Sequence, residues 1–272
     1  PALAEELRSA AGTLSEATLW RLALKAFATT AAYDRAISNT LALLRQGPPQ
    51  SLPEILDIRA PRRMGLRYGE NPHQSASLYA DGDRGVAGAR QLQGKELSYN
   101  NLVDLDAAWQ LAMEFQRPAA AIIKHTNPCG CAEQETLEAA YRKALECDPV
   151  SAFGGVLAFN RPLDGPTAAA VAALFVEAIA APAYSAEALE RLKTKKNLRL
   201  VEVAGDGEWL VVKAISGGYL VQTADSATLD PKQLKVVTRR PPTGPEMAAL
   251  EFAWKVAKHV KSNAIVYAVE GQ

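Results

Sequence analysis

A lysine and a histidine stand side by side directly behind a short apolar run, in the stretch A-A-I-I-K-H-T-N-P-C-G-C-A of residues 120–132. The imidazole side chain has a pKa of about 6.5, so its neutral form can accept a proton at physiological pH. A lysine ammonium stays charged unless it is desolvated, and it can stabilise a negative oxygen or a phosphate. Lys124 and His125 are therefore suited to acyl transfer onto an amine, with the histidine taking the proton while the ammonium meets the developing oxyanion. The alternative is a surface lysine beside a histidine bonded to loop backbone, and the spacing alone leaves both open.

The two cysteines of the same stretch raise the alternative of a metal site. Structural zinc sites generally use C-x2-4-C pairs and four ligands, whereas Cys129 and Cys131 have one residue between them. Zinc deaminases carry H-x-E together with P-C-x-x-C. Here P-C-G-C is one residue short, and none of the three histidines is followed by x-Glu. We therefore expect the cysteines to be small apolar fillers around a turn, with no metal bound.

Composition excludes some classes of partner. The 272 residues carry 30 basic and 30 acidic side chains, so no net charge favours nucleic acid or an anionic membrane. With 3 cysteines a disulfide framework is not expected, and a reducing compartment is favoured. There is no apolar run of the roughly 18 to 20 residues that a membrane span needs, and no signal peptide. We expect a cytoplasmic protein, and the missing initiator methionine indicates either a fragment of a longer protein or a processed product.

The elements around the lysine–histidine pair alternate between strands and helices. Residues 119–123 have the length of a buried strand, and a helix with one apolar face follows the cysteines. The pair is thus expected at a strand–loop–helix junction, at the carboxyl end of the strand, where ligands usually bind in open α/β sheets. Residues 151–160 are predicted to be a glycine-containing turn that leads into a strand, and further strands are predicted at 176–181, 198–203, 209–214 and 264–269. The predicted class is α/β.

Sequence signals also place several helix starts. The first 46 residues read as helical, with a capping box at Thr13–Glu16 and two periodic stretches. A helix is expected over 102–113, after a polar turn at 97–101. Ser185 is a plausible N-cap, and a second capping box begins at Thr243. Three prolines within residues 46–53 indicate a linker or domain boundary.

Several separated segments then match one family in order. They are R-Y-G-E-N-P-H-Q (67–74), L-S-Y-N-N-L-V-D (97–104), K-H-T-N-P-C-G (124–130), D-P-V-S-A-F-G-G (148–155) and S-N-A-I-V-Y-A (262–268). Together they resemble the bifunctional purine-biosynthesis enzymes with aminoimidazole carboxamide ribonucleotide (AICAR) transformylase and inosine monophosphate (IMP) cyclohydrolase activities. F-A-T-T-A-A-Y-D (27–34) resembles the helical end of that family's cyclohydrolase domain.

The resemblance implies a fold, a reaction and a domain plan. The fold would be a cytidine-deaminase-like α/β/α layered transformylase core that needs no zinc, preceded by a helical segment. The reaction would be formyl transfer from 10-formyltetrahydrofolate to the 5-amino group of AICAR, in a homodimer. The plan would be a cyclohydrolase tail at 1–46, a linker at 47–59, a first transformylase subdomain at 60–225 and the start of a second at 226–272.

The same resemblance assigns roles to individual residues. His125 matches the proton-accepting histidine of the family and Lys124 the lysine that stabilises the transition state. His73 is a candidate second catalytic histidine, the alternative being an imidazole that stabilises its turn. Nucleotide-binding roles fall on Arg67, Tyr68, Asn101 and Asn263, whereas His259 is expected to be solvated or bonded to backbone.

Departures from the family pattern leave further alternatives open. The ring-closing residues of the cyclohydrolase and the segment G-A-G-Q-x-S-R that follows in the family are absent, and Ala183 replaces a common glycine. The chain alone could thus be a nucleotide-binding or assembly module without activity. The third alternative, beside the transformylase and the inactive module, is a relative of the zinc-dependent deaminases.

Overall fold

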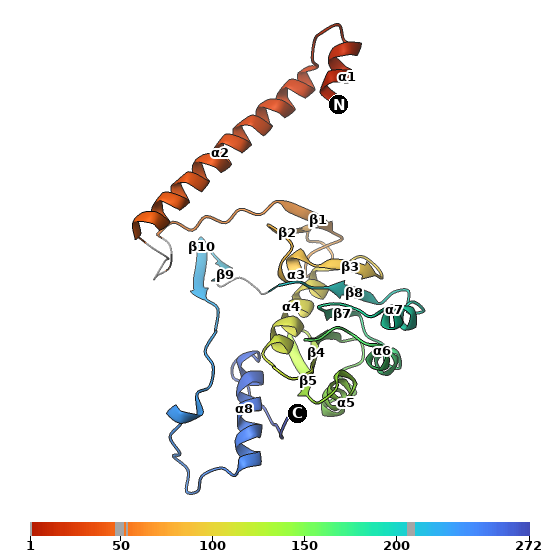
Figure 1. Cartoon of the computed structure of the whole chain (residues 1–272), viewed down its shortest axis with the longest axis vertical. Coiled ribbons are helices and arrows are strands. Elements are labelled where there is room, and N and C mark those ends of the chain that lie inside the picture. Colours follow the sequence, from red (N-terminus) through yellow and green to blue (C-terminus); the bar gives the residue numbers. More distant parts are fainter. Residues whose placement is uncertain (1, 47–51, 53, 206–209) are drawn as a thin grey trace. The chain divides into compact units, whose positions relative to one another are not determined.

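The computed structural model describes residues 2–46, 52, 54–205 and 210–272 (Figure 1). The chain divides into two compact units, one of residues 1–57 with 212–223 and the other of residues 58–211 with 224–272. Both helices and strands are present, which confirms the α/β class. Within the described residues, no helix combines the length and the apolar character that crossing a membrane requires.

The first unit begins with helices α1 (Ala2–Ser9) and α2 (Glu16–Gln46). The two periodic stretches predicted here form one uninterrupted helix of 31 residues. The capping box predicted at Thr13 is wrong, because the Thr13 hydroxyl donates to the carbonyl oxygen of Ala10 at 2.6 Å. The Ser15 hydroxyl instead accepts from the backbone N–H of Thr18 at 3.3 Å, so the cap lies two residues later.

A mixed six-stranded sheet forms the centre of the second unit, in the order β3-β8-β7-β6-β4-β5. Strand β4 pairs antiparallel with β5 and β6, β6–β7–β8 run parallel, and β3 is antiparallel to β8. The strands are β3 (Arg90–Gln93), β4 (Ala119–Lys124), β5 (Asn127–Glu133), β6 (Val156–Phe159), β7 (Ala178–Ala181) and β8 (Arg199–Glu202).

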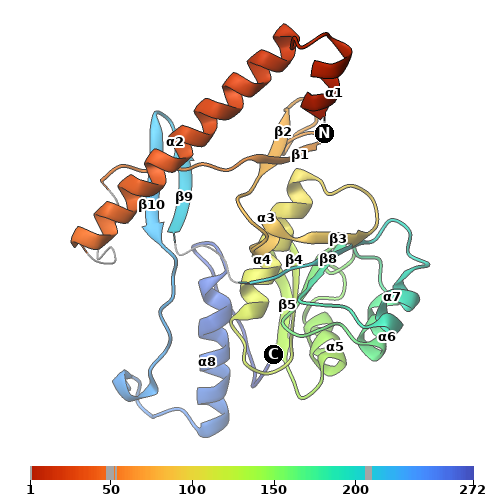
Figure 2. The same cartoon turned by 45° about the horizontal axis from the view of Figure 1, so that its top comes forward.

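Helices cover both faces of this sheet (Figures 1 and 2). Because side chains alternate along a strand, Ala121 and Ile123 of β4 join the core beneath α4 and α8, while Ala120 and Ile122 join the core on the opposite face. The first face carries α4 (Tyr99–Met113) and α8 (Gly244–Lys258), and the second carries α5 (Leu137–Cys147), α6 (Gly165–Ala172) and α7 (Ala186–Leu192). The predicted caps at Ser185 and Thr243 are confirmed.

The structure corrects the expected surroundings of the lysine–histidine pair. Residues 127–133, which were expected to be a loop, form strand β5, so the order is strand–turn–strand–helix. A β-bulge shifts the register between Ile122 and Ile123, and Cys129 and Cys131 consequently pack against different cores. Cys131 is 4% exposed.

Smaller elements complete the described chain. The hairpins β1–β2 and β9–β10, the short helix α3 and the turn η1 were not predicted, apart from β9. Residues 264–269, predicted as a strand, are not one. Trp209 and most of the proline-rich stretch at 46–53 lie outside the described residues. The bounds are β1 (Arg62–Leu66), β2 (Ala76–Tyr79), α3 (Gly85–Gly88), β9 (Leu210–Ile215), β10 (Gly218–Thr223) and η1 (Pro231–Gln233).

The close packing of α5 on β5 gives a first testable prediction. A Cβ atom on Gly130 would lie 1.9 Å from the carbonyl oxygen of Ala144, a backbone atom that cannot swing away. We expect Gly130→Ala to destabilise the fold by about 1–3 kcal/mol or more, measured as a lower urea midpoint of unfolding. The matched control is Gly65→Ala in β1, where a Cβ meets nothing within 4 Å. Equal midpoints for the two variants would contradict the packing described.

Candidate active site

His125 and Thr126 form the two-residue turn of the β4–β5 hairpin. Lys124 pairs with Asn127 across it, and the φ angles of His125 and Thr126 are 52° and 62°. Two successive left-handed residues are typical of a type I′ turn, which favours Asn-Gly or Gly-Gly. A left-handed conformation at a non-glycine residue costs on the order of 1–3 kcal/mol, and a β-branched threonine tolerates it poorly. The turn is therefore strained and needs support from its surroundings.

Four hydrogen bonds support the turn. The backbone N–H of Thr126 donates to Asp104 Oδ1 at 2.8 Å, and the Thr126 hydroxyl donates to the His125 carbonyl at 2.7 Å. Asn127 Nδ2 also donates to the His125 carbonyl at 3.1 Å, and Lys261 Nζ donates to the Thr126 hydroxyl at 3.0 Å. Two of these bonds come from outside the hairpin, from helix α4 and from the segment after α8. Thr126 is therefore held through its backbone by Asp104 and through its hydroxyl by Lys261, while the side chain of His125 is exposed.

Lys124 is half-buried and turned towards the loop of residues 148–155. Its ammonium donates to the carbonyl oxygen of Phe153 at 2.9 Å. Hydrogen bonds from the hydroxyl and backbone of Ser151, with a smaller contribution from the Lys124 charge, lower the pKa of the nearby Asp148 carboxyl. Burial raises the pKa of the Cys129 thiol, so the thiol stays neutral beside the charged lysine. The ammonium group of Lys124 thus lies beside the turn of the hairpin. It could release the carbonyl oxygen of Phe153 and bind the oxygen of a ligand in its place.

Three of the predicted nucleotide-binding residues line one cavity of about 440 Å³. The guanidinium of Arg67 lies over the Tyr68 ring, 5.1 Å from its centroid. Arg199 pairs with Glu177 at 2.7 Å, whereas in the described part of the chain no carboxylate pairs with Arg67. Of the two arginines that line the cavity, Arg67 is therefore the one whose guanidinium could bind a phosphate. The cavity is lined by Arg67, Tyr68, Lys95, Glu96, Leu97, Ser98, Asn101, Glu177 and Arg199.

Asn101 is held in place by the start of helix α4. The Ser98 hydroxyl accepts from the Asn101 backbone N–H at 3.1 Å, and Asn101 Oδ1 accepts from the Ser98 backbone N–H at 3.2 Å. The predicted polar turn at 97–101 is therefore a capping box. Because the cap uses the amide oxygen, the amide N–H groups are what Asn101 offers a ligand.

The first turns of α4 connect the cavity to the lysine–histidine turn. Asn101 lines the cavity, and Asp104, three residues later on the same helix, binds the backbone of Thr126. Asn100 Nδ2 also reaches the carbonyl of Glu70 at 3.5 Å, in the segment that carries His73.

The remaining predicted residues lie outside the cavity lining. Lys124 and His125 are at the turn, and His73 is exposed in a loop whose backbone is bonded by the Gln74 amide. Asn263 is exposed, two residues after the Lys261 that contacts the turn. Arg67, Tyr68 and Asn101 thus lie around one cavity, whereas His73 and Asn263 are exposed elsewhere on the surface.

His259 differs from the expectation of a solvated or backbone-bonded side chain. Its Nε2 lies 3.0 Å from Glu114 Oε1, and its side chain is 14% exposed. Lys258 donates to the same oxygen at 2.7 Å. Burial opposes ionisation of Glu114, but the two partners outweigh it and lower the pKa of its carboxyl. His259 therefore fastens the end of α8 to the end of α4.

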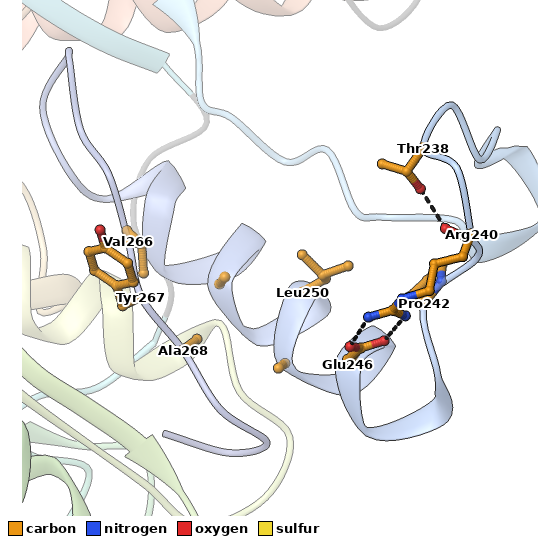
Figure 3. A pocket seen from close by; sticks show the side chains of 10 residues that line it. Thr238, Arg240, Pro242, Glu246, Leu250, Val266, Tyr267 and Ala268 are labelled. Carbon is orange, nitrogen blue, oxygen red and sulfur yellow. Dashed lines mark hydrogen bonds and ion pairs between the residues drawn. The ribbon is translucent and has the colours of Figure 1, made fainter.

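Two further features are possible sites elsewhere in the chain, a second cavity and any group of side chains that could bind a metal ion. A cavity of about 570 Å³ is lined by side chains from α8, from the segment 238–242 and from residues 266–268 (Figure 3). Its charged lining residues, Arg240 and Glu246, pair with each other at 2.7 Å, and Arg240 lowers the pKa of Glu246 to about 2. Within the ranges that the structure describes, no group of three or more histidine, cysteine or acidic side chains is arranged to hold a metal ion.

Asp104 and Lys261 were not predicted as neighbours of the turn. Asp104 stood in the segment 97–104, three residues beyond Asn101, and that helical spacing was the available signal. Lys261 carried no such signal, because its contact joins residues 135 apart in the chain.

Known proteins match the chain along its whole length. A model of the AICARFT/IMPCHase bienzyme family matches residues 1–272. The bifunctional purine biosynthesis protein PurH of Roseobacter denitrificans is 50% identical over 278 residues, which cover 99% of this chain and 52% of the relative. PurH of Parvibaculum lavamentivorans is 51% identical over 279 residues (99% and 51%), and that of Agrobacterium fabrum 49% over 281 residues (100% and 52%).

The chain spans about half the length of these curated relatives. The match extends through both units of the structure, since the family model covers every residue from 1 to 272. It confirms the resemblance seen in the ordered sequence segments. The chain belongs to the AICARFT/IMPCHase bienzyme family.

Proposed function

We propose that the full-length protein transfers a formyl group from 10-formyltetrahydrofolate to the 5-amino group of AICAR, and that it also carries an IMP cyclohydrolase activity whose site lies outside these 272 residues. Family membership supports a purine-biosynthesis enzyme with two activities. The observation that carries the transformylase proposal is the supported, strained turn that presents Lys124 and His125 at the end of β4.

The proposed chemistry follows from the substrate amine. Its lone pair is conjugated with the ring and the carboxamide, so it is a poor nucleophile. As its nitrogen attacks the formyl carbon, neutral His125 takes the amine proton, and Lys124 stabilises the negative charge that develops on the formyl oxygen. The carbon–nitrogen bond to the folate then breaks, and the folate nitrogen leaves with the proton that His125 had taken, so the imidazole is neutral again. No metal is required.

The binding roles are proposed on the same basis. Arg67 would hold the nucleotide phosphate, with Tyr68 beside it, while Asn101 and Asn263 would orient the heterocycle. His73 would be a second catalytic histidine. Helices on both faces of the mixed sheet support a cytidine-deaminase-like layered core.

The wider setting is also proposed. We propose that the enzyme is a cytoplasmic homodimer. The domain plan would be a cyclohydrolase tail at 1–46, a linker at 47–59 and transformylase subdomains at 60–225 and from 226 onwards.

A second candidate is that the 272-residue chain alone binds nucleotide without catalysis. It is favoured by the separation between the cavity of Arg67, Tyr68 and Asn101 and the turn of Lys124 and His125, and by the half-length match to the relatives.

Two measurements separate these candidates. Calorimetry with AICAR reports binding, and a formyl-transfer assay is run on both the full-length protein and the 272-residue chain. Turnover by the full-length protein supports the first proposal, and binding without turnover by the shorter chain supports the second. A full-length protein that binds AICAR but forms no formamido product would overturn the first.

A further inference from the structure

We infer that Asp104 is a positioning residue that holds the His125–Thr126 turn in its left-handed conformation and so aims the imidazole. The inference rests on the proposed function for its effect on turnover. Its structural part is independent of that function, because it concerns the backbone of the turn.

Asp104 is suited to this task by where it stands. Its neighbours on α4, Leu102 and Leu105, are 9% and 0% exposed, so the helix is anchored in the core. The carboxylate of Asp104 accepts the Thr126 backbone N–H at 2.8 Å, a charge-assisted bond. Of the four bonds at the turn, this one ties its backbone directly to a helix that is anchored in the core.

The other three bonds cannot replace it. Those from the Thr126 hydroxyl and from Asn127 lie within the hairpin, so they shape the turn without fixing it relative to the sheet. Lys261 is exposed, and it reaches a side-chain hydroxyl rather than the backbone.

Strain makes the tether matter. Thr126 has φ 62° and His125 φ 52°, a conformation that neither residue type favours. Without the Asp104 carboxylate, the turn is free to relax into other conformations, and the His125 imidazole then loses the orientation that the turn gives it. Misplacement by about 1 Å lowers a reaction rate by up to roughly 10²-fold.

The test uses the full-length protein and a double-mutant cycle. Asp104→Ala is expected to lower kcat for formyl transfer by about 10–100-fold, with KM for AICAR within about threefold. Asp104→Asn keeps an acceptor oxygen and is expected to restore most of kcat. In a Thr126→Gly background, where the left-handed conformation costs nothing, the loss caused by Asp104→Ala is expected to shrink to about threefold.

The control and the structural readout complete the design. Asp106→Ala removes an exposed carboxylate on the same helix that accepts from Gln110 at 2.7 Å, and it should leave kcat unchanged. Hydrogen exchange at the Thr126 amide should accelerate in Asp104→Ala but not in Asp106→Ala. If Asp104→Ala does not fold, Asp104→Glu, which keeps the charge but moves the acceptor, takes its place.

The outcomes distinguish the two claims. An equal loss of kcat in the wild-type and Thr126→Gly backgrounds, or unchanged exchange of the Thr126 amide, would overturn the positioning role. A wild-type full-length protein without formyl transfer would overturn the proposed function, and amide exchange would still decide whether Asp104 holds the turn.

Discussion

Replacing His125 by alanine in the full-length protein is expected to lower kcat for formyl transfer by about 10²–10⁴-fold, the usual contribution of a positioned general base. The physical reason is the weak nucleophilicity of the conjugated amine, which needs its proton removed as the bond forms. The exposed imidazole carries none of the core packing, so the fold should persist. AICAR binding should persist too, since the cavity of Arg67, Tyr68 and Asn101 is lined by other residues.

The measurement is steady-state kinetics together with calorimetry of AICAR binding. A matched control is His259→Gln, because His259 binds Glu114 and lies outside the proposed chemistry. This control should change the stability of α8 docking and leave kcat near the wild-type value. Turnover of His125→Ala within a few-fold of wild type would remove the general-base assignment.

Replacing Lys124 by methionine is expected to lower kcat by about 10²–10³-fold, the scale measured for loss of one oxyanion donor. Methionine keeps the length and the apolar stem of the side chain but has no charge. The variant also loses the bond to the Phe153 carbonyl, which is at an exposed loop and adds little to stability. Most of the effect should therefore appear in kcat rather than in the urea midpoint.

Two further variants sharpen this prediction. Lys124→Arg keeps the positive charge with a planar, wider head group, so it should recover only part of the loss. Lys143→Met removes an exposed lysine that pairs with Glu146 on helix α5, and it should leave kcat unchanged. If Lys124→Met and Lys143→Met turn over equally, Lys124 does not stabilise the transition state.

The alternation of helices and strands could be predicted because the buried segments carry clear periodicity. Helix α5 buries Leu137, Ala140, Tyr141 and Ala144 as its spacing indicated, and β4 has the burial of a central strand. Caps such as Thr243 were readable because hydroxyl and carboxylate stand three residues apart. The same pattern misled at Thr13, since Ser15 was an equally suitable cap closer to the apolar helix.

Strand β5 could not be predicted because its sequence reads as a turn. Pro128 and Gly130 are both residues that favour turns. In this strand, a β-bulge accommodates Pro128, and the missing side chain of Gly130 allows α5 to pack closely. For residues 264–269 the error was the opposite one, because a strand was predicted and none is present. They alternate in burial as a strand would, with Ile265 and Tyr267 81% and 94% exposed, but they pair with no strand among the described residues. Strand identity depends on a partner, which a sequence pattern does not supply.

The sequence suggested residues for the candidate site, but it did not predict the geometry in which they lie. The lysine and histidine were identified by type and by family resemblance, whereas the left-handed turn that presents them lacks the usual glycine signal. Helical spacing from Asn101 was the one sequence signal for Asp104. The contact from Lys261 joins residues 135 apart in the chain and could not be seen in the sequence.

The most direct test of the central claim is chemical rescue of His125→Ala. The single-turnover rate of formyl transfer by the full-length variant is measured with increasing imidazole, beside the wild type and Lys124→Met. If His125 removes the amine proton, imidazole should raise the rate of the His125 variant in proportion to its free base, and should not raise that of Lys124→Met or wild type. The same dependence on imidazole in all three proteins, or undiminished transfer by His125→Ala without it, would contradict the account.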